Sequence, residues 1–253
     1  MGYFIDIQGT LIDDKNFRPL PGAIEFIDFL NQKNIPFVLV TNNTKRESGE
    51  FIKYLQNLGF KFNENQYIDP LMIIKKELKN IVLKPYGNEK FVKIIENSFK
   101  TSQNPEAVIL GIKVYTLDEI SEIIELLLKG VKLYGMHKTS LYMKNERRYP
   151  GLGAILEMLK YASGKDYEIF GKPSRKFFEK AAEKMGLNFD KITIISDDLY
   201  GDLIPAKKMG MKTVLVLSGK IKNINEISQK PDFIYKNLKD YLKELKTESR
   251  YGE

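Results

Sequence analysis

The first residues of this sequence that could do chemistry are carboxylates at the ends of short apolar runs. Asp6 stands in YFIDIQGT, where apolar residues surround it and Gly9 ends the run. A carboxylate at the tip of a buried strand, ahead of a glycine turn, can serve as a nucleophile or as a metal ligand. Many enzymes with such a loop carry a second carboxylate two residues further on, and here that residue is Gln8.

A second acidic group follows a later apolar run, in ISDDLYGD. Asp197, Asp198 and Asp202 are so close in the chain that their charges repel unless a cation or a lysine lies among them. Mg²⁺ prefers oxygen ligands, so Asp197 at the strand tip, beside Asp6, predicts a magnesium site. For Asp198 we favour a plainer role, as the cap of the helix that follows.

Two further residues could bind an anion. Lys172 comes just before Pro173 and Ser174, which suit the first turn of a helix, and its ammonium could balance the charge of a bound phosphate. Thr41 ends the apolar run IPFVLVT. Neither residue alone indicates a function. The prediction depends on the order in which both residues and the two acidic groups occur along the chain.

Strands and helices that alternate along the chain must bring these residues together. The apolar strands end in Asp6, Thr41, Asp197 and Ser218. Continuous apolar strands between amphipathic helices indicate an α/β fold, a Rossmann-like doubly wound parallel sheet, whose ligands bind beyond the carboxyl ends of the strands. The predicted strands are 3–7, 35–41, 191–198 and 212–219, and the predicted helices are 21–34, 47–60, 174–187 and 203–211.

A stretch of different character interrupts this pattern. Residues 78–166 contain their own strands and helices and are long enough to bury a small core. We therefore predict a core domain made of 1–77 and 167–253, with 78–166 inserted as a smaller α/β cap domain.

Composition narrows the classes of function. The chain has 253 residues and a net charge of +7, but its lysines are scattered among glutamates at helical spacing, which favours solvated helix faces over a nucleic-acid surface. The absence of cysteine leaves oxygen ligands or the single histidine, His137, for any metal. We find no apolar run that could span a bilayer and no signal peptide, and we expect a cytoplasmic protein.

Four motifs in order resemble those of the haloacid dehalogenase-like superfamily. DIQGTL, VLVTNNT, GKPS and ISDDLYGDL match its first to fourth motifs, and the insertion between Thr41 and Lys172 falls where the NagD and para-nitrophenylphosphatase-like branch places a large α/β cap. LPGAIEFIDFL, PGLGAILEML, VLVLSGK and PDFIYKNLKD also resemble that branch, so the similarity covers nearly the whole chain.

The resemblance implies a Mg²⁺-dependent phosphatase that hydrolyses a small phosphate monoester. Asp6 would be the nucleophile that forms an aspartyl-phosphate. The implied Mg²⁺ ligands are Asp6, the backbone carbonyl of Gln8 and Asp197, with Asp202 behind them to orient Lys172 or a metal-bound water. Thr41 and Lys172 would hold the phosphoryl oxygens, with Asn42 nearby. Such catalysis works by positioning and charge neutralisation.

The departures from the family pattern lie in two motifs. Ser196 and Gly201 replace a glycine and a threonine in the fourth motif and leave its carboxylates in place. In the first motif Gln8 stands where phosphatases of this superfamily carry the aspartate that protonates the leaving oxygen and later activates water. An amide has no titratable proton near neutral pH, so general acid catalysis is impaired or relocated.

Three accounts of Gln8 remain open. The protein could be a slow phosphatase or one whose substrates have good leaving groups; it could bind a phosphorylated ligand without turning it over; or the residue could be an introduced substitution that traps a complex. Asp13 and Asp14 could supply a replacement acid, but a turn role for that pair is favoured. A receiver-like phospho-switch is disfavoured because Asp6 lies on the first strand and the insertion is large.

The cap contributes His137 and the stretch KNERRYPG. His137 follows a predicted cap strand, and a role in substrate binding competes there with that of an ordinary buried or surface histidine. Arg147 and Arg148 could bind a second anionic group or simply be solvated. The expected partner is a small phosphorylated metabolite, with no nucleic acid and no membrane, and a homodimer is left open.

Overall fold

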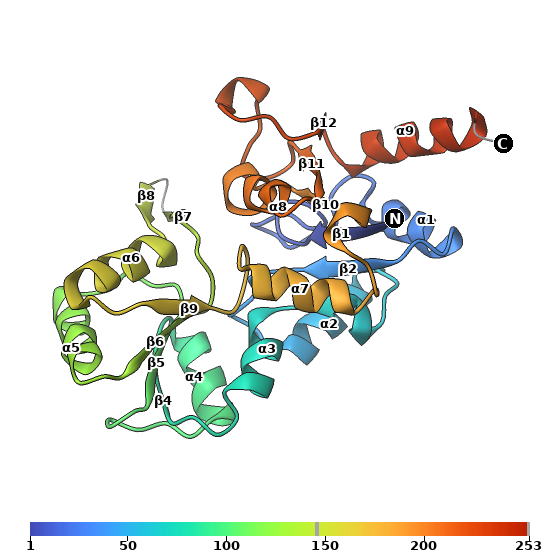
Figure 1. Cartoon of the computed structure of the whole chain (residues 1–253). Helices are drawn as coiled ribbons and strands as arrows, with labels where there is room; N and C mark the ends of the chain where they lie inside the picture. Colours follow the sequence, from blue (N-terminus) through green and yellow to red (C-terminus); the bar gives the residue numbers. More distant parts are fainter. Residues whose placement is uncertain (145–146, 252–253) are drawn as a thin grey trace. The chain divides into compact units, whose positions relative to one another are not determined.

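The computed structural model describes residues 1–144 and 147–251 and divides into two compact units (Figure 1). The first unit comprises Met1–Thr41, Phe51–Ile68 and Phe178–Glu253, and the second comprises Asn42–Glu50 and Asp69–Phe177. These bounds differ from those of the predicted core, 1–77 with 167–253, and the predicted cap, 78–166. Each unit is described by itself.

A six-stranded parallel sheet forms the centre of the first unit. Its spatial order is β12-β11-β10-β1-β2-β3, and every pairing is parallel. The fold is therefore α/β with a parallel sheet, as predicted. The strands are β1 (Gly2–Asp6), β2 (Phe37–Val40), β3 (Tyr67–Ile68), β10 (Ile192–Ser196), β11 (Lys212–Val216) and β12 (Phe233–Tyr235).

Successive residues of β1 point to opposite faces of the sheet, and helices cover both. Tyr3 is fully buried against Phe26 and Tyr241, with ring centroids 5.7 and 6.4 Å away. On the other face Phe4 stacks on Phe178 at 5.8 Å. The α-helices of this fold are α1 (Ala23–Gln32), α2 (Ser48–Asn57), α7 (Arg175–Glu183), α8 (Ile204–Lys208) and α9 (Leu238–Tyr251). Burial of aromatic side chains on both faces makes the doubly wound arrangement that the sequence predicts.

Short helical turns lie between some of these elements. They are the 3₁₀ turns η1 (Glu64–Gln66), η2 (Phe189–Lys191) and η4 (Ile224–Glu226), and a π-helical segment, η3 (Leu199–Leu203). Of these, η3 matters for the site, because it leads from the end of β10 directly into α8.

The second unit has a four-stranded parallel sheet of its own, in the order β4-β5-β6-β9, and a separate antiparallel hairpin of β7 and β8. Its strands are β4 (Leu83–Tyr86), β5 (Ala107–Leu110), β6 (Lys132–Gly135), β7 (Leu141–Lys144), β8 (Arg147–Pro150) and β9 (Tyr167–Ile169). Its helices are α3 (Pro70–Glu77), α4 (Glu89–Ser98), α5 (Leu117–Leu128) and α6 (Leu152–Ser163).

Strand β9 differs from the prediction, which places residue 167 in the core domain. Leu133 pairs with Tyr167 and Gly135 with Ile169, so β9 completes the sheet of the second unit. The strand has three residues and its central Glu168 is exposed, so it lacks the apolar run by which the other strands are predicted.

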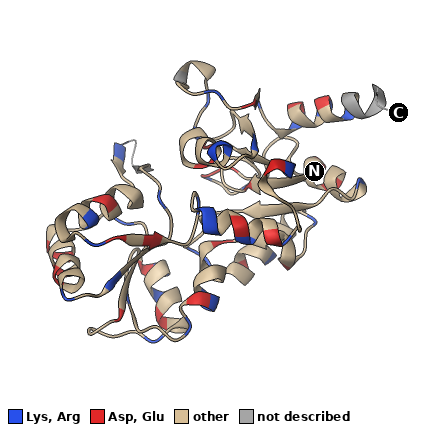
Figure 2. Ribbon diagram, viewed as in Figure 1, with Lys and Arg blue, Asp and Glu red and all other residues tan. Residues whose placement is uncertain are grey.

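Residues of both charges lie along the helices of each unit (Figure 2). Several form ion pairs, among them Lys75 with Glu47 at 2.6 Å and Lys207 with Asp232 at 2.6 Å. This is the pattern of solvated helix faces. No helix within residues 1–144 and 147–251 has the length and apolar character to cross a membrane.

Candidate active site

The register of the central strands brings the predicted residues to one edge of the sheet. Ile5 lies beside Ile195 of β10, and Asp6 lies beside Val40 of β2. Asp6, Thr41 and Asp197 therefore follow or end three adjacent strands at their carboxyl ends. The side chains of all three are buried, with exposed fractions of 6%, 0% and 2%.

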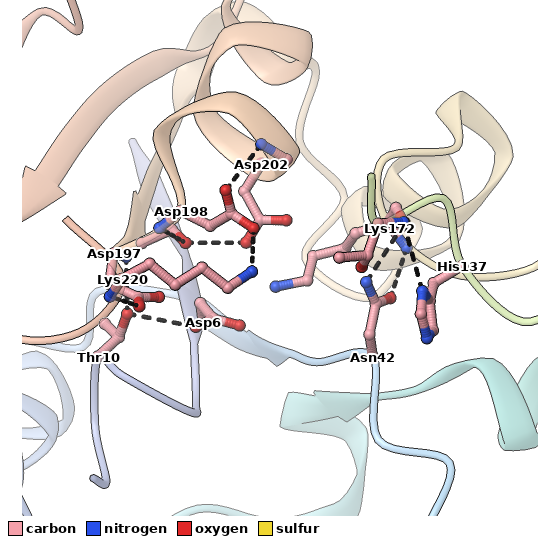
Figure 3. A network of polar contacts seen from close by, with 12 residues as sticks. Asp6, Thr10, Asn42, His137, Lys172, Asp197, Asp198, Asp202 and Lys220 are labelled. Carbon is pink, nitrogen blue, oxygen red and sulfur yellow. Dashed lines mark hydrogen bonds and ion pairs between the residues drawn. The ribbon is translucent and has the colours of Figure 1, made fainter. Parts of the chain in front are cut away.

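Thr10 joins the two acidic strand ends. Its hydroxyl donates to Oδ2 of Asp6 at 3.3 Å and accepts a hydrogen bond from the backbone N–H of Asp197 at 3.1 Å (Figure 3). Thr10 belongs to the first motif, DIQGTL, but it is not among the predicted site residues. Its hydroxyl fixes the loop after β1 against the end of β10.

Two glycines leave room for the carboxylate of Asp197. A Cβ atom on Gly9 would lie 2.2 Å from Oδ2 of Asp197, and one on Gly219 would lie 2.0 Å from the same oxygen. Gly9 also has a φ of +81°, which side chains other than glycine rarely adopt. Any other residue at either position would therefore displace the acidic side chain.

Burial and charge act together on Asp197. Burial, and then the negative charge of Asp6, raise its pKa well above the ordinary value of an aspartate, against a hydrogen bond of 2.6 Å from the backbone N–H of Lys220. Two buried carboxylates that repel each other are the kind of oxygen donors that a hard divalent cation binds. The residues present therefore fit a magnesium ion. Within residues 1–144 and 147–251 no three Asp, Glu or His side chains are grouped so that they could hold a metal ion, and this site has two carboxylates.

Asp198 serves as a helix cap, as predicted. Its Oδ1 accepts the backbone N–H of Gly201 at 2.8 Å, at the start of η3. Its Oδ2 forms an ion pair with the ammonium of Lys220, whose side chain is 52% exposed. Desolvation lowers the pKa of Lys220, and the charges of Asp198, Asp202 and Asp197 outweigh this, so that its pKa is raised overall.

Ser196, where the family pattern has glycine, holds Asp202. The serine hydroxyl donates to Oδ2 of Asp202 at 2.8 Å and accepts the backbone N–H of Asp198 at 3.1 Å. Asp202 is 4% exposed, so this hydrogen bond stabilises a buried carboxylate. Its predicted role in orienting Lys172 or a metal-bound water stays a prediction.

Gln8 and Thr41 contact each other. The hydroxyl of Thr41 donates to Oε1 of Gln8 at 2.8 Å. The amide that replaces the usual aspartate is thus fixed to the neighbouring strand end by the residue predicted to bind a phosphoryl oxygen. Asp13 accepts the backbone N–H groups of Lys15, Asn16 and Arg18 at 2.6–3.0 Å, which confirms its turn role.

The second unit contains the other predicted residues. Oδ1 of Asn42 accepts the backbone N–H of Lys172 at 2.8 Å, and its Nδ2 donates to the carbonyl of the same residue at 3.3 Å (Figure 3). Asn42 therefore binds the backbone of a lysine that is only 3% exposed. This gives Asn42 a positioning role in addition to the predicted substrate-binding one.

His137 is buried at the end of β6, with 5% of its surface exposed. Its Nδ1 accepts the backbone N–H of Thr139 at 3.4 Å, and the next residue, Lys138, donates its backbone N–H to the carbonyl of Lys172 at 3.3 Å. Arg147 and Arg148 are exposed on β8. Residues 145–146 of the stretch KNERRYPG lie outside the described residues.

The structure thus gathers the predicted site residues in two groups. Asp6, Gln8, Thr41, Asp197 and Asp202 belong to the first unit, and Asn42, His137 and Lys172 belong to the second. The predicted site residues do not include Thr10, Ser196 or Lys220. Thr10 accepts the backbone N–H of Asp197, and the backbone N–H of Lys220 donates to the Asp197 carboxylate, so both contacts join residues that are far apart in the sequence.

Family models match two ranges of the chain, which together include most of the first unit. The model described as haloacid dehalogenase-like hydrolase matches residues 3–102, and a second model of the same hydrolases matches 169–241. The chain belongs to the haloacid dehalogenase-like hydrolases. The matched ranges contain all four motifs, from Asp6 to Asp202.

Individual relatives cover most of the chain. The haloacid dehalogenase-like hydrolase domain-containing protein 2 of Mus musculus is 27% identical over 88% of this chain and 86% of its own length. The phospholysine phosphohistidine inorganic pyrophosphate phosphatase of Homo sapiens is 26% identical over 89% and 86%. Among solved structures, the 4-nitrophenylphosphatase of Thermotoga maritima is 26% identical, covers 95% of both chains and has a TM-score of 0.80. NagD of E. coli, 23% identical over 94% and 97% with a TM-score of 0.75, shares the fold. These likenesses place this hydrolase in the NagD and p-nitrophenylphosphatase-like branch.

Proposed function

We propose that this haloacid dehalogenase-like hydrolase is a Mg²⁺-dependent phosphatase that cleaves a small phosphate monoester through Asp6. The observation that carries the proposal is the pair of buried carboxylates, Asp6 and Asp197, at the carboxyl edge of the central strands. The printed names of relatives, a 4-nitrophenylphosphatase and a phospholysine phosphohistidine inorganic pyrophosphate phosphatase, support phosphate esters and related compounds as the substrate class. A small phosphorylated metabolite in the cytoplasm stays the expected substrate.

Asp6, Asp197 and the backbone carbonyl of Gln8 would hold the metal. When bound, Mg²⁺ supplies positive charge that neutralises the phosphoryl oxygens. Thr10 keeps a proton directed at Oδ2 of Asp6, which orients the carboxylate. The backbone N–H of Lys220 orients the carboxylate of Asp197 in the same way.

The nucleophile acts first. A carboxylate oxygen of Asp6 attacks the phosphorus atom, the bond to the leaving oxygen breaks, and an aspartyl-phosphate forms. Water then attacks the phosphorus atom, the bond to Asp6 breaks, and orthophosphate leaves. Thr41 would bind a phosphoryl oxygen during both displacements, and its burial favours such a contact by keeping water from competing. Lys172 stays the predicted second residue for the phosphoryl oxygens.

Gln8 favours a second candidate function. Because an amide cannot donate a proton to the leaving group or take one from water, the protein could bind a phosphorylated ligand without turning it over. General acid–base catalysis typically contributes about 10²–10⁴-fold, so loss of the acid alone would slow turnover without abolishing it.

Steady-state hydrolysis of a panel of phosphate compounds, with and without Mg²⁺, separates these functions. We expect Mg²⁺-dependent turnover by the wild type and a loss on the order of 10³-fold or more in Asp6→Asn, which removes the nucleophile. Wild-type protein that binds a phosphate compound in calorimetry but releases no phosphate, while Gln8→Asp does, would establish the binding function instead.

A further inference from the structure

Gln8 and its hydrogen bond to Thr41 point to a restricted class of substrates. We propose that this amide limits the protein to phosphate compounds whose leaving group departs as a stable anion, such as acyl phosphates and the phosphate esters of acidic phenols. The inference rests on the proposed function and adds the chemistry of the leaving group to it.

The amide of Gln8 lies beside the end of β2. Gln8 follows Asp6 by two residues, and Thr41 follows Val40, the neighbour of Asp6 on β2. The hydrogen bond of 2.8 Å between Thr41 Oγ1 and Gln8 Oε1 therefore holds the amide at the strand edge that carries Asp6. Its carbonyl end is engaged by Thr41, and the end that is left is an NH₂ group, which only donates hydrogen bonds.

The NH₂ group of Gln8 limits the chemistry that this side chain can do. An NH₂ group can stabilise negative charge that builds up on an oxygen atom, but its proton does not transfer near neutral pH. A leaving group that requires a proton to depart gains little from such a donor. One that is stable as an anion loses nothing by the absence of an acid.

A replacement acid would have to be a neighbouring carboxylate. Four of these carboxylates are engaged with other groups: Asp197 with the backbone N–H of Lys220, Asp198 with the Lys220 ammonium, Asp202 with Ser196, and Asp13 with its own turn. Using any of them as the acid would cost the interaction it makes. The leaving group therefore determines the rate of the first displacement.

The displacement balances without an acid. A carboxylate oxygen of Asp6 forms a bond to phosphorus, and the phosphorus–oxygen bond of the leaving group breaks with its electron pair on the leaving oxygen. For an acyl phosphate the product is a carboxylate, which needs no proton at neutral pH. For an alkyl phosphate the product would be an alkoxide, which takes a proton from bulk water only after an unassisted departure.

The test compares kcat/KM for acetyl phosphate, 4-nitrophenyl phosphate, phenyl phosphate and glycerol phosphate, at fixed Mg²⁺, in wild type, Gln8→Asp and Gln8→Glu. The ratio kcat/KM reports steps up to the first irreversible one, so slow hydrolysis of the aspartyl-phosphate does not mask the effect of the leaving group. Gln8→Glu is the matched variant, because it keeps the side-chain length and the acceptor for Thr41 while adding a proton that can transfer.

We expect wild-type kcat/KM to fall steeply from acetyl phosphate to glycerol phosphate. In Gln8→Asp or Gln8→Glu the value for glycerol phosphate should rise by about 10²–10⁴-fold, the usual contribution of a general acid, while that for acetyl phosphate changes less than about tenfold. Wild-type values that are equal across the series, or an equal rise for every probe in both variants, would overturn the inference.

The same measurements separate this inference from the proposed function. If Asp6→Asn abolishes a wild-type activity that does not depend on the leaving group, the phosphatase stands and the inference falls. If wild type, Gln8→Asp and Gln8→Glu release no phosphate from any probe, both fall.

Discussion

The carboxylate of Asp197 occupies space that two glycines leave open. Gly9 and Gly219 lie against this carboxylate in two different loops, and at neither position is there room for a Cβ atom. Interiors are packed closely enough that a single added methyl group must displace its neighbour when the contact falls so far inside van der Waals distance. The position of an oxygen that we propose as a metal ligand thus depends on two residues that have no functional group.

Gly219→Ala tests this dependence. Its Cβ would lie 2.0 Å from Oδ2 of Asp197, so we expect the carboxylate to shift, unfolding free energy to fall by about 1–3 kcal/mol, and Mg²⁺-dependent turnover to fall with it. Urea unfolding and steady-state kinetics measure the two effects. Gly49→Ala in α2 is the control, because no atom lies within 4 Å of the added Cβ, and there stability should stay equal or rise. Similar losses in the two variants would contradict this account.

At the scale of elements, the junction of β10 with η3 carries the acidic group. Ser196 ends the strand, Asp198 caps the π-helical segment, and Asp202 lies within it. The two side-chain hydrogen bonds of Ser196 and the cap at Gly201 tie this turn together locally. The carboxylates are therefore positioned by the turn itself before any ligand binds.

Two substitutions of Asp198 separate its cap from its ion pair with Lys220. Asp198→Ala removes both and should lower the free energy of unfolding by about 1 kcal/mol, the usual value of an N-cap. Asp198→Asn keeps a capping oxygen and should cost less than half of that, because the lysine partner is half exposed and such pairs contribute little. Urea denaturation measures both; equal losses would show that the ion pair, and not the cap, stabilises the segment.

Much of the fold follows from patterns that are local in the sequence. Phe37–Val40 and Lys212–Val216 are predicted because buried parallel strands are continuous apolar runs, and Asp6, Thr41 and Asp197 share an edge because parallel strands end together. Tyr167–Ile169 is missed because three residues around an exposed glutamate give no such run. Thr10 and Lys220 are missed because they act at Asp197, and that proximity exists only once the sheet has formed.

At the scale of the whole molecule, the buried acidic pair opposes folding unless a cation is bound. The raised pKa of Asp197 means that the folded chain holds a proton which the unfolded chain releases. The sign follows from linkage: metal-free stability falls as the pH rises from about 4, the ordinary aspartate value, toward the raised pKa. Two variants that differ only at residue 197 share every other titratable group, so the difference between their stabilities isolates the effect of Asp197.

Asp197→Asn should therefore stabilise the metal-free protein relative to wild type, by an increment that grows with pH above about 4. In a molecule of this size each kcal/mol shifts Tm by about 2–4 °C. Thermal unfolding in EDTA measures the increment. Adding Mg²⁺ at 100 times its Kd should stabilise wild type by about 2.7 kcal/mol and the variant by much less. A wild-type Tm that does not respond to Mg²⁺ would argue against a metal at Asp197.

The strand order has a consequence for synthesis of the chain. β1 pairs on one side with β2, about thirty residues later, and on the other with β10, whose pairing partner for Gly2 is Ile192. Most of the second unit, from Asp69 to Phe177, is made between those two events. A nascent chain can bring Asp6 beside Val40 early, but Asp197 and the backbone N–H of Lys220 emerge only after Asp69–Phe177 has been made. Products that terminate before Asp197 therefore carry Asp6, the proposed nucleophile, without the second carboxylate of the proposed metal site.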